Sequence, residues 1–342
     1  MARVIRATTE KRRILGELIP LSVPFTCSVG VTNVCNFKCK YCPQSVRPAG
    51  VENRMMAWDI YQKLVDDLTE FPEKLKLLML SGLGEPLLHP RIADMVAYAK
   101  EKQVAETVRI ITNASVLTHE LSDKLIDAGL DHLKVSIQGL DDEGYQSMSR
   151  APVPFARILD NLAYFFEHKK DTVVNVKIVS DAFKTSGDEQ RFYEMFGGIC
   201  DVINIEHISQ YQELVDYSQF MGEEFVSQVG NTEGVNSICQ APFYFFAVFP
   251  DGEIVPCHHI TFDQYKMISM GNVADVNLAQ WWNSERFNRF RLKLLRNERS
   301  SMPLCTNCRF FQAECHPEDN IDNYADQLIE KYEKIIKAQS HS

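Results

Sequence analysis

Six short apolar segments alternate with helix-like segments between residues 25 and 208, and this alternation limits the possible folds more than any other feature. The predicted strands are residues 25–32, 75–80, 107–112, 133–138, 173–180 and 202–208. Apolar residues at helical spacing predict helices over 57–71, 92–102, 121–128, 155–168 and the segment ending near 196. Helical crossovers between strands imply a parallel sheet with helices outside. Six strands are fewer than the eight of a complete barrel, so the pattern leaves a partial barrel and a doubly wound sheet open.

Two of these helices carry capping signals. Thr118 is the predicted N-cap of the helix at 121–128, and Gly129 is its predicted stop. Ser186 and Glu189 have the spacing of a capping box before the helix that ends near residue 196.

Three cysteines with the spacing C-x3-C-x2-C, Cys35, Cys39 and Cys42, follow the first predicted strand. A [4Fe–4S] cluster usually has four cysteine ligands. Three thiolates without a fourth nearby would therefore leave one iron open to a non-protein ligand. A zinc knuckle or three unrelated buried thiols are the alternatives, although zinc sites usually pair two C-x2-C units or combine them with histidine.

With Tyr41 before its last cysteine, this loop resembles the C-x3-C-x-aromatic-C motif of the radical S-adenosylmethionine (SAM) superfamily. The resemblance implies that the open iron binds the amino and carboxylate groups of SAM. Reductive cleavage would then give methionine and a 5′-deoxyadenosyl radical, which takes a hydrogen atom from the substrate. The resemblance also favours a partial (β/α)6 TIM-like barrel.

Polar residues follow the predicted strands at the end where parallel β/α barrels have their active sites. After the second strand come Gly82, Gly84 and Glu85, where glycine allows a close backbone approach to a ligand. This segment resembles the Gly-Gly-Glu motif of the family, which implies contacts to the SAM amino group, although Leu83 separates the two glycines. An ordinary turn is the alternative.

Further SAM contacts are implied by the same resemblance. Ser136 is the candidate for the ribose hydroxyls, with Asn113 nearby, and Arg150 is the candidate for the carboxylate. For Arg150 a surface position is equally compatible with the sequence.

The fifth and sixth predicted strands bring Lys177, Glu206 and His207 to the same end, and these are the candidates for a general base. Because side chains alternate along a strand, we expect only one of Glu206 and His207 to face the barrel interior.

A second group of cysteines follows a glycine-containing break in the alternation. Asp251 and Gly252 lie between two apolar runs and predict a hairpin, and a helix is predicted around residues 281–295. The cysteines of this region are Cys239, Cys257, Cys305 and Cys308, with Cys315 further on. Four cysteines in two pairs can close a metal site, for which zinc is an alternative.

The order of these cysteines, with Gly-Asn-Val from residue 271 and Trp-Asn-Ser-Glu-Arg-Phe from residue 282, resembles the SPASM/Twitch extension of radical SAM enzymes. A full SPASM pattern has seven cysteines, whereas this region has five. The resemblance therefore implies one auxiliary [4Fe–4S] cluster, on Cys239, Cys257, Cys305 and Cys308. Cys315 would then be a replacement ligand, a hydrogen-atom donor or a buried thiol.

We therefore expect an α/β chain in which a small C-terminal iron–sulfur domain with a β-hairpin and helices follows the partial barrel. The predicted division is an N-terminal extension at 1–22, the barrel at 23–219, a linker at 220–238, the auxiliary domain at 239–318 and a C-terminal helix at 319–342. The apolar stripe of that last helix is expected to pack against the barrel.

Composition excludes several classes of function. A net charge of −10 argues against a nucleic-acid substrate, and the basic residues between 286 and 299 are expected on a solvated helix face. The chain has no apolar run near the ~20 residues that cross a bilayer and no signal-peptide pattern at its start, so we expect a cytoplasmic protein. Cysteines in that compartment are more often metal ligands than disulfides.

The first functional hypothesis is oxidation or epimerisation of a small polar molecule such as a sugar, an aminocyclitol or a nucleoside-like alcohol. Flavodoxin or ferredoxin would supply electrons, and Cys315 would return a hydrogen atom in an epimerase. A redox-neutral elimination is also compatible. The alternatives are a peptide-modifying maturase, disfavoured by the short segment before the first strand, and a zinc-stabilised protein without enzymatic activity.

Overall fold

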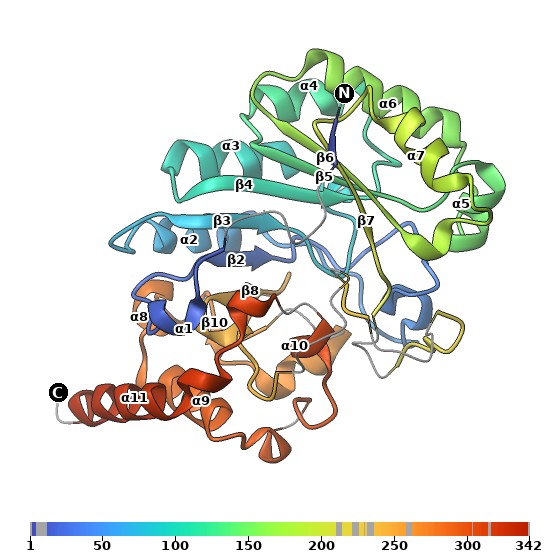
Figure 1. Cartoon of the computed structure of the whole chain (residues 1–342). Helices are drawn as coiled ribbons and strands as arrows, with labels where there is room; N and C mark the ends of the chain where they lie inside the picture. The colour runs from blue at the N-terminus through green and yellow to red at the C-terminus, as the bar shows by residue number, and fades with distance from the viewer. Residues whose placement is uncertain are drawn as a thin grey trace.

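The computed structural model describes residues 2–4, 12–209, 214–220, 226–228, 230, 236–257, 262–302, 304–313 and 316–340. Within them one continuous sheet has the strand order β1-β7-β6-β5-β4-β3-β2-β8-β9-β10 (Figure 1). The strands are β1 (Arg3–Val4), β2 (Thr26–Val29), β3 (Leu75–Leu80), β4 (Ala105–Thr112), β5 (His132–Ile137), β6 (Val173–Val179), β7 (Val202–Glu206), β8 (Phe245–Val248), β9 (Glu253–Val255) and β10 (Gly271–Asn272). Pairing from β1 through β8 is parallel, and β9 and β10 add antiparallel strands at one edge.

Helices cover the outer face of the parallel strands (Figure 1). They are α2 (Trp58–Leu68), α3 (Ile92–Lys102), α4 (His119–Asp127), α5 (Asp142–Ser149), α6 (Phe155–His168) and α7 (Asp188–Phe196). Alternate strand residues such as Leu133, Val135 and Val176 pack with these helices in the main hydrophobic core. The residues between them therefore face the barrel interior. The predicted partial (β/α)6 barrel is confirmed, with β2–β7 as its six strands.

Of the two predicted capping signals at helix N-termini, one is confirmed and the other is wrong. Thr118 Oγ1 accepts a hydrogen bond from Leu121 N (3.2 Å) and caps α4, as predicted. The capping box at Ser186 is wrong, because the N-cap of α7 is Gly187 without a side-chain bond. Instead the Asp188 carboxylate accepts hydrogen bonds from the backbone just before the helix. Helix α5 was missed, because its apolar residues are few.

The C-terminal region extends the barrel sheet. Strand β8 pairs in parallel with β2, in the register Thr26↔Phe245. The predicted linker at 220–238 stays a prediction, because much of it lies outside the described residues. The predicted hairpin is formed by β8 and β9, and Gly252 takes a positive φ of 84° at its turn.

The helix expected around 281–295 is two helices, α8 (Leu278–Trp282) and α9 (Glu285–Leu295). Ser284 separates them, because its hydroxyl accepts a hydrogen bond from Phe287 N (3.3 Å) and starts a new helix.

The remaining helices are α1 (Leu15–Leu18), α10 (Phe310–Ala313) and α11 (Ala325–Gln339). The apolar stripe of α11, formed by Leu328, Tyr332 and Ile336, packs in a second hydrophobic cluster with α1 and α9. The expected packing of this helix against the barrel is therefore wrong. An N-terminal segment and a C-terminal helix, more than 300 residues apart in the chain, share this cluster.

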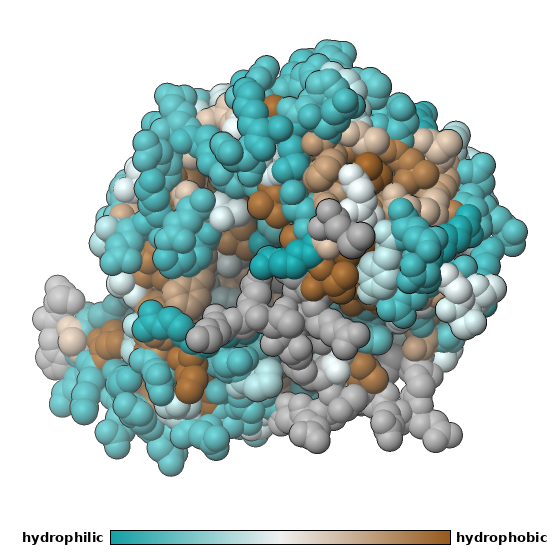
Figure 2. All heavy atoms as spheres, turned by 45° about the horizontal axis from the view of Figure 1, so that its top comes forward, coloured by the Kyte–Doolittle hydropathy of each residue, from teal (hydrophilic) through white to brown (hydrophobic). Residues whose placement is uncertain are grey.

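Hydrophilic residues predominate on the face of the molecule in Figure 2, with hydrophobic residues between them.

Among the described residues, the helices are all too short or too polar to span a bilayer.

Arg291 was expected on a solvated helix face, but the structure buries it to 2% exposure. Its guanidinium donates to the carbonyls of Pro242 and Trp282 (both 2.9 Å) and stacks on the rings of Trp282 and Phe287. Burial lowers the pKa of Arg291 to about 10. Arginine suits this position because its planar fork can donate several hydrogen bonds and stack at the same time. The other basic residues of α9, Arg286, Arg289 and Lys293, are exposed.

Replacing Arg291 by methionine is expected to destabilise the protein by about 3 kcal/mol, because hydrogen bonds and stacking are lost in the C-terminal core. The change would be measured as a lower urea midpoint under anaerobic conditions. Arg289→Met, on the exposed face of the same helix, should stay within about 0.5 kcal/mol of wild type. Equal effects of the two substitutions would contradict this prediction.

Candidate active site

The loop with Cys35, Cys39 and Cys42 follows β2 and is held against the end of α5. Lys38 N and Lys40 N donate to the carbonyls of Ser149 (2.9 Å) and Met148 (3.0 Å). The three thiols are half-buried. The pKa of Cys39 is raised, first by burial and then by its electrostatic interaction with the neighbouring Cys42 and Cys35 thiols. The three sulfurs therefore lie within electrostatic reach of one another, where a cationic metal group would stabilise their thiolate forms.

The donor set fits an iron–sulfur cluster. Cys35 Sγ accepts a hydrogen bond from Phe37 N (3.4 Å), which is the kind of contact that stabilises a cluster-bound sulfur. Across the residues that the structure describes, no three His, Cys, Asp or Glu side chains converge closely enough to hold a single metal ion. Cluster ligands stand farther apart than the ligands of one ion, because each binds a different corner of the cube.

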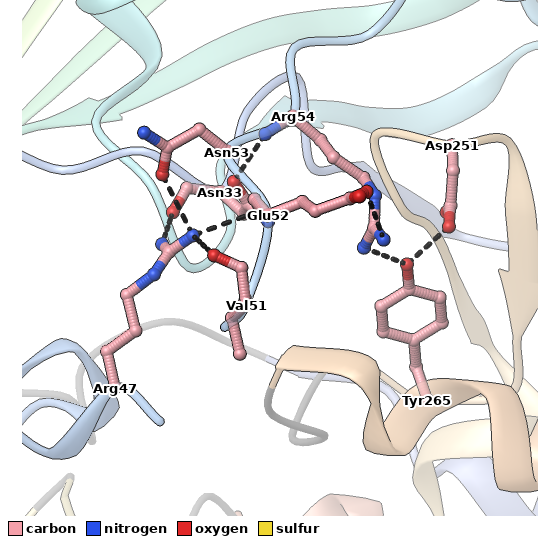
Figure 3. A network of polar contacts seen from close by, with 8 residues as sticks. All are labelled: Asn33, Arg47, Val51, Glu52, Asn53, Arg54, Asp251 and Tyr265. Carbon is pink, nitrogen blue, oxygen red and sulfur yellow. Dashed lines mark hydrogen bonds and ion pairs between the residues drawn. The ribbon is translucent and has the colours of Figure 1, made fainter. Parts of the chain in front are cut away.

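Figure 3 shows how the start of this loop is fixed to the segment after it. Asn33 Nδ2 donates to Glu52 O (2.9 Å), and its side-chain oxygen accepts from Arg54 N (2.8 Å). Arg47 donates to the Asn33 carbonyl (2.6 Å) and to Asn53 Oδ1 (3.0 Å). These contacts hold the backbone on both sides of the cysteines.

The same network reaches the C-terminal region (Figure 3). Arg54 Nη1 lies 3.4 Å from the Tyr265 hydroxyl, which donates to Asp251 in the β8–β9 turn. Tyr265 also stacks on Phe249, with ring centroids 4.1 Å apart. Strand β9 continues from this turn toward Cys257, so Tyr265 connects the two cysteine-bearing parts of the chain.

Gly84 lies where no other residue fits. A Cβ at this position would come within 2.4 Å of Thr32 O and 2.7 Å of Val34 O, in the backbone leading to Cys35. A Cβ on Gly82 would lie 3.1 Å from the Gly30 Cα. The glycine segment therefore packs directly on the cysteine loop. Its predicted contact with SAM remains a prediction.

The Glu85 carboxylate is 3% exposed and accepts three protein hydrogen bonds, from Leu87 N (3.0 Å), Thr112 Oγ1 (2.6 Å) and Asn113 N (2.8 Å). A carboxylate has about four acceptor positions, so about one remains for a ligand. Burial raises the pKa of Glu85 to about 7, against the opposing effect of these hydrogen bonds. The side chain thus joins the end of β3 to the end of β4.

The raised pKa of Glu85 predicts a pH dependence of stability. Its value is about 7 in the folded protein against an ordinary value of 4.5, so between these values the folded state binds more protons than the unfolded state. The contribution is fully present below pH 4.5 and is lost as the pH rises to 7, by about 3 kcal/mol. Urea unfolding of SAM-free protein should show this decline, and Glu85→Gln should lack it. Parallel pH profiles of the two proteins would contradict the assignment.

The other SAM candidates lie around the cysteine loop. Asn113 Nδ2 donates to Asn36 Oδ1 (3.0 Å), between two of the cysteines, and the Tyr41 hydroxyl donates to Gln138 Oε1 (2.8 Å) just after β5. Ser136 faces the barrel interior in register with Lys177. Arg150 is exposed at the end of α5, and its charge opposes the rise of the Cys39 pKa. The structure brings these residues together on the cysteine side of the barrel, and their roles stay predictions.

As expected, only one of these two residues faces the barrel interior, and it is Glu206 rather than His207. Glu206 is paired with Lys134 (2.8 Å) and closely with Lys177, whereas His207 is exposed and lies 3.3 Å from Ser180 Oγ. Lys134 is not among the predicted site residues, because it lies in the middle of β5 and not at a strand end. The alternation of apolar and polar residues along β5 was the signal that could have found it.

Opposing effects act on the pKa of Glu206. Burial by itself raises it, but the charges of Lys134 and Lys177 and their hydrogen bonds hold it below the usual range. Burial also raises the pKa of Tyr41. Electrostatic interactions with Cys39, Cys42 and Glu206 raise it further. Glu206 therefore lies within electrostatic reach of the cysteine loop.

The auxiliary cysteines are also gathered by the fold. Burial raises the pKa of Cys239 to about 12, with further contributions from Cys308 and Cys305. Cys257 packs in the same hydrophobic cluster as Leu304, the residue before Cys305. Cys308 Sγ accepts a hydrogen bond from Phe310 N (3.4 Å). This arrangement fits a second iron–sulfur cluster. Cys315 lies outside the described residues.

Arg299 holds the Cys305–Cys308 loop in place, although the sequence predicts only a solvated basic residue at this position. Its Nη2 donates to the carbonyls of Cys305 (2.9 Å) and Cys308 (2.6 Å), and the guanidinium stacks 3.8 Å from the centre of the Phe311 ring.

Replacing Arg299 by glutamine is expected to weaken retention of the auxiliary cluster, with a loss of up to about four irons per chain. SAM cleavage should persist, because the Cys35 loop is untouched. Iron and sulfide analysis after gel filtration measures the loss. Arg296→Gln is the matched control, because Arg296 pairs with Glu333 at the surface. Full iron content in the Arg299 variant would contradict a positioning role.

Comparison with known proteins agrees with this geometry. The family model of the radical SAM superfamily matches residues 29–191, and the model of the SPASM iron–sulfur cluster-binding domain matches residues 239–309. The chain is 26% identical over 313 residues to the tungsten-containing aldehyde ferredoxin oxidoreductase cofactor-modifying protein of Pyrococcus furiosus, covering 81% of this chain and 85% of the relative.

Two solved structures share the fold at low identity. SuiB of Streptococcus suis bound to S-adenosylmethionine has a TM-score of 0.63 at 16% identity, over 86% of this chain and 74% of SuiB. BtrN in complex with AdoMet and 2-DOIA has a TM-score of 0.53 at 20% identity, over 84% of this chain and 93% of BtrN. With both cysteine groups inside the matched segments, the chain belongs to the radical SAM superfamily as an enzyme with a C-terminal SPASM-type domain, and its cofactors are SAM and [4Fe–4S] clusters.

Proposed function

We propose that this enzyme oxidises or epimerises a small polar substrate inside the barrel, such as a sugar, an aminocyclitol or a nucleoside-like alcohol, with one auxiliary cluster. The observation that carries the proposal is the ion-paired cluster of Lys134, Glu206 and Lys177 on the inner face of β5–β7. Such a set of charges suits a compact polar molecule and supplies a proton acceptor.

When bound, SAM and the clusters supply the radical that removes a hydrogen atom and, in an oxidation, the acceptor for the remaining electron. Flavodoxin or ferredoxin would be the electron donor for SAM cleavage. The protein must hold the substrate near the cysteine loop, exclude water and accept the hydroxyl proton. Tyr41 connects the loop to this space through its hydrogen bond to Gln138 (2.8 Å).

Glu206 is the proposed proton acceptor. Its side chain is 11% exposed, its carboxylate is ionised, and its partners hold it in one orientation. Lys177 on the neighbouring strand β6 and Lys134 on β5 position it. His207 is not proposed for this role, because its side chain lies outside the interior. For an epimerase, Cys315 remains the proposed hydrogen-atom donor.

Analysis of products tests the proposal. Reduced, reconstituted enzyme is incubated with SAM and a panel of polyols, sugars and aminocyclitols, and 5′-deoxyadenosine is measured with each. Oxidation lowers the substrate mass by two hydrogens. Epimerisation in deuterated water, with a thiol as donor, adds one deuterium to the inverted carbon. Absence of 5′-deoxyadenosine above background with every compound of this panel would overturn the proposal.

Peptide modification is the second candidate, because SuiB shares the fold and is described with its precursor peptide SuiA at a TM-score of 0.62. A short peptide encoded beside this enzyme would be the substrate to test. Stimulation of 5′-deoxyadenosine formation by that peptide, and not by small polyols, would favour this candidate.

A further inference from the structure

We propose that the substrate carries an anionic group, a carboxylate or a phosphate ester, which Lys134 and Lys177 bind inside the barrel. This inference rests on the proposed function, since it names the class of substrate for the same site.

The two lysines come from neighbouring strands and share one partner. Lys134 Nζ lies 2.8 Å from Glu206 Oε1, and Lys177 contacts Oε2 closely. Glu206 also accepts hydrogen bonds from Asn204 Nδ2 (3.4 Å) and Gln228 Nε2 (2.9 Å). The carboxylate therefore has its acceptor positions filled, whereas the ammonium groups do not have their donors filled.

Each ammonium has three N–H donors, and in the described part of the chain Glu206 is the one partner of each. Their side chains keep 21% and 17% of their surface exposed, so they can be reached. Two positive charges against one negative charge leave an excess of +1 in a mostly buried place. Such an excess is unfavourable without a counter-charge, and a bound anion would supply it.

The surroundings strengthen the positive field. Arg109 on β4 also faces the interior and donates to His132 Nδ1 (3.1 Å). Burial, then the charges of Arg109 and Lys134, lower the pKa of His132 to about 3, so the imidazole is neutral. Among the described inward-facing residues of β4–β7, Glu206 supplies the negative charge and three residues supply positive charge. A neutral polyol would leave this imbalance, whereas a carboxylate would reduce it by one charge and a phosphate ester by up to about two.

Anion binding would also make Glu206 a stronger proton acceptor. A negative group on Lys134 and Lys177 competes with Glu206 for the two ammonium groups and repels its charge, and both effects make the carboxylate easier to protonate. Glu206 would then become an effective base when the substrate is bound. This coupling would limit proton transfer to molecules with the anionic group.

The experiment uses full-length reconstituted enzyme, saturated with SAM, under anaerobic conditions at constant ionic strength. Isothermal titration compares inorganic phosphate, glucose 6-phosphate and glucuronate with glucose, in wild type and in Lys134→Met and Lys177→Met. Each variant retains a one-to-one ion pair with Glu206. Lys170→Met, which removes a surface lysine paired with Asp127, is the matched control.

We expect wild type and the Lys170 variant to bind at least one of the anionic probes at least tenfold more tightly than glucose, and both interior variants to lose that preference. The phosphate and glucuronate arms distinguish a phosphate ester from a carboxylate. Equal binding of glucose and all anions, or unchanged preference in both interior variants, would overturn the inference. Dithionite-driven formation of 5′-deoxyadenosine is measured in the same samples. A wild type that cleaves no SAM refutes the proposed function instead.

Discussion

Replacing Cys35, Cys39 and Cys42 together by alanine is expected to lower the iron content from about eight to about four per chain and to abolish 5′-deoxyadenosine formation. The three thiols lie on one loop that backbone hydrogen bonds hold against α5, so their removal should leave the auxiliary group of cysteines intact. Iron and acid-labile sulfide after anaerobic reconstitution, with chromatography of the nucleoside product, measure both effects.

Cys200→Ala is the control for this experiment. Its thiol is buried in the main core, where its Sγ donates to Phe196 O (3.1 Å), and it is far along the chain from both cysteine groups. It should retain both the iron and the SAM cleavage activity. If wild type held only about four irons and the triple variant none, the auxiliary cysteines would hold no cluster, and redox-neutral chemistry would become the better account.

Replacing Glu206 by glutamine is expected to lower the rate of product formation at least 100-fold, because the proposed proton acceptor is lost. The amide also leaves Lys134 and Lys177 without a counter-charge, which should destabilise the protein by about 3 kcal/mol or more. Uncoupled cleavage of SAM should continue, since the cysteine loop is unchanged. Product and 5′-deoxyadenosine are measured in parallel.

A second substitution separates the two effects. In Lys134→Met/Glu206→Gln the excess charge returns to the wild-type value of +1, so part of the stability should return. The rate of product formation should stay low, because the carboxylate is still absent. A double variant that regained both stability and rate would show that Glu206 acts by charge balance alone.

Much of the fold could be predicted because it depends on local patterns. Strand β3 and helices α3 and α6 begin and end where their apolar periodicity does. Cys35, Cys39 and Cys42 could be recognised because they are close together in the sequence. The second cysteine group could be recognised only by the order of its cysteines and motifs, and the family models match around both groups. The turn at Gly252 was predictable for the same reason, since it depends on neighbouring residues.

The candidate site could be predicted only in part. Arg299 and Arg291 looked like other basic residues of a helical region, and only their carbonyl and aromatic partners distinguish them. The register of β7 against β6, which pairs Val179 with Glu206, decides which of Glu206 and His207 faces the barrel interior. A one-residue shift would exchange the two side chains.

The sequence by itself determined the six-strand alternation, the group of Cys35, Cys39 and Cys42, and the hairpin, because each depends on residues a few positions apart. The tertiary structure alone decided that β8 joins β2 and that Lys134 meets Glu206, 72 residues away. Such contacts depend on which strands become neighbours and in what register. Periodicity along one strand contains no information about the strand beside it, so the charge inside the barrel appears only when the sheet is assembled.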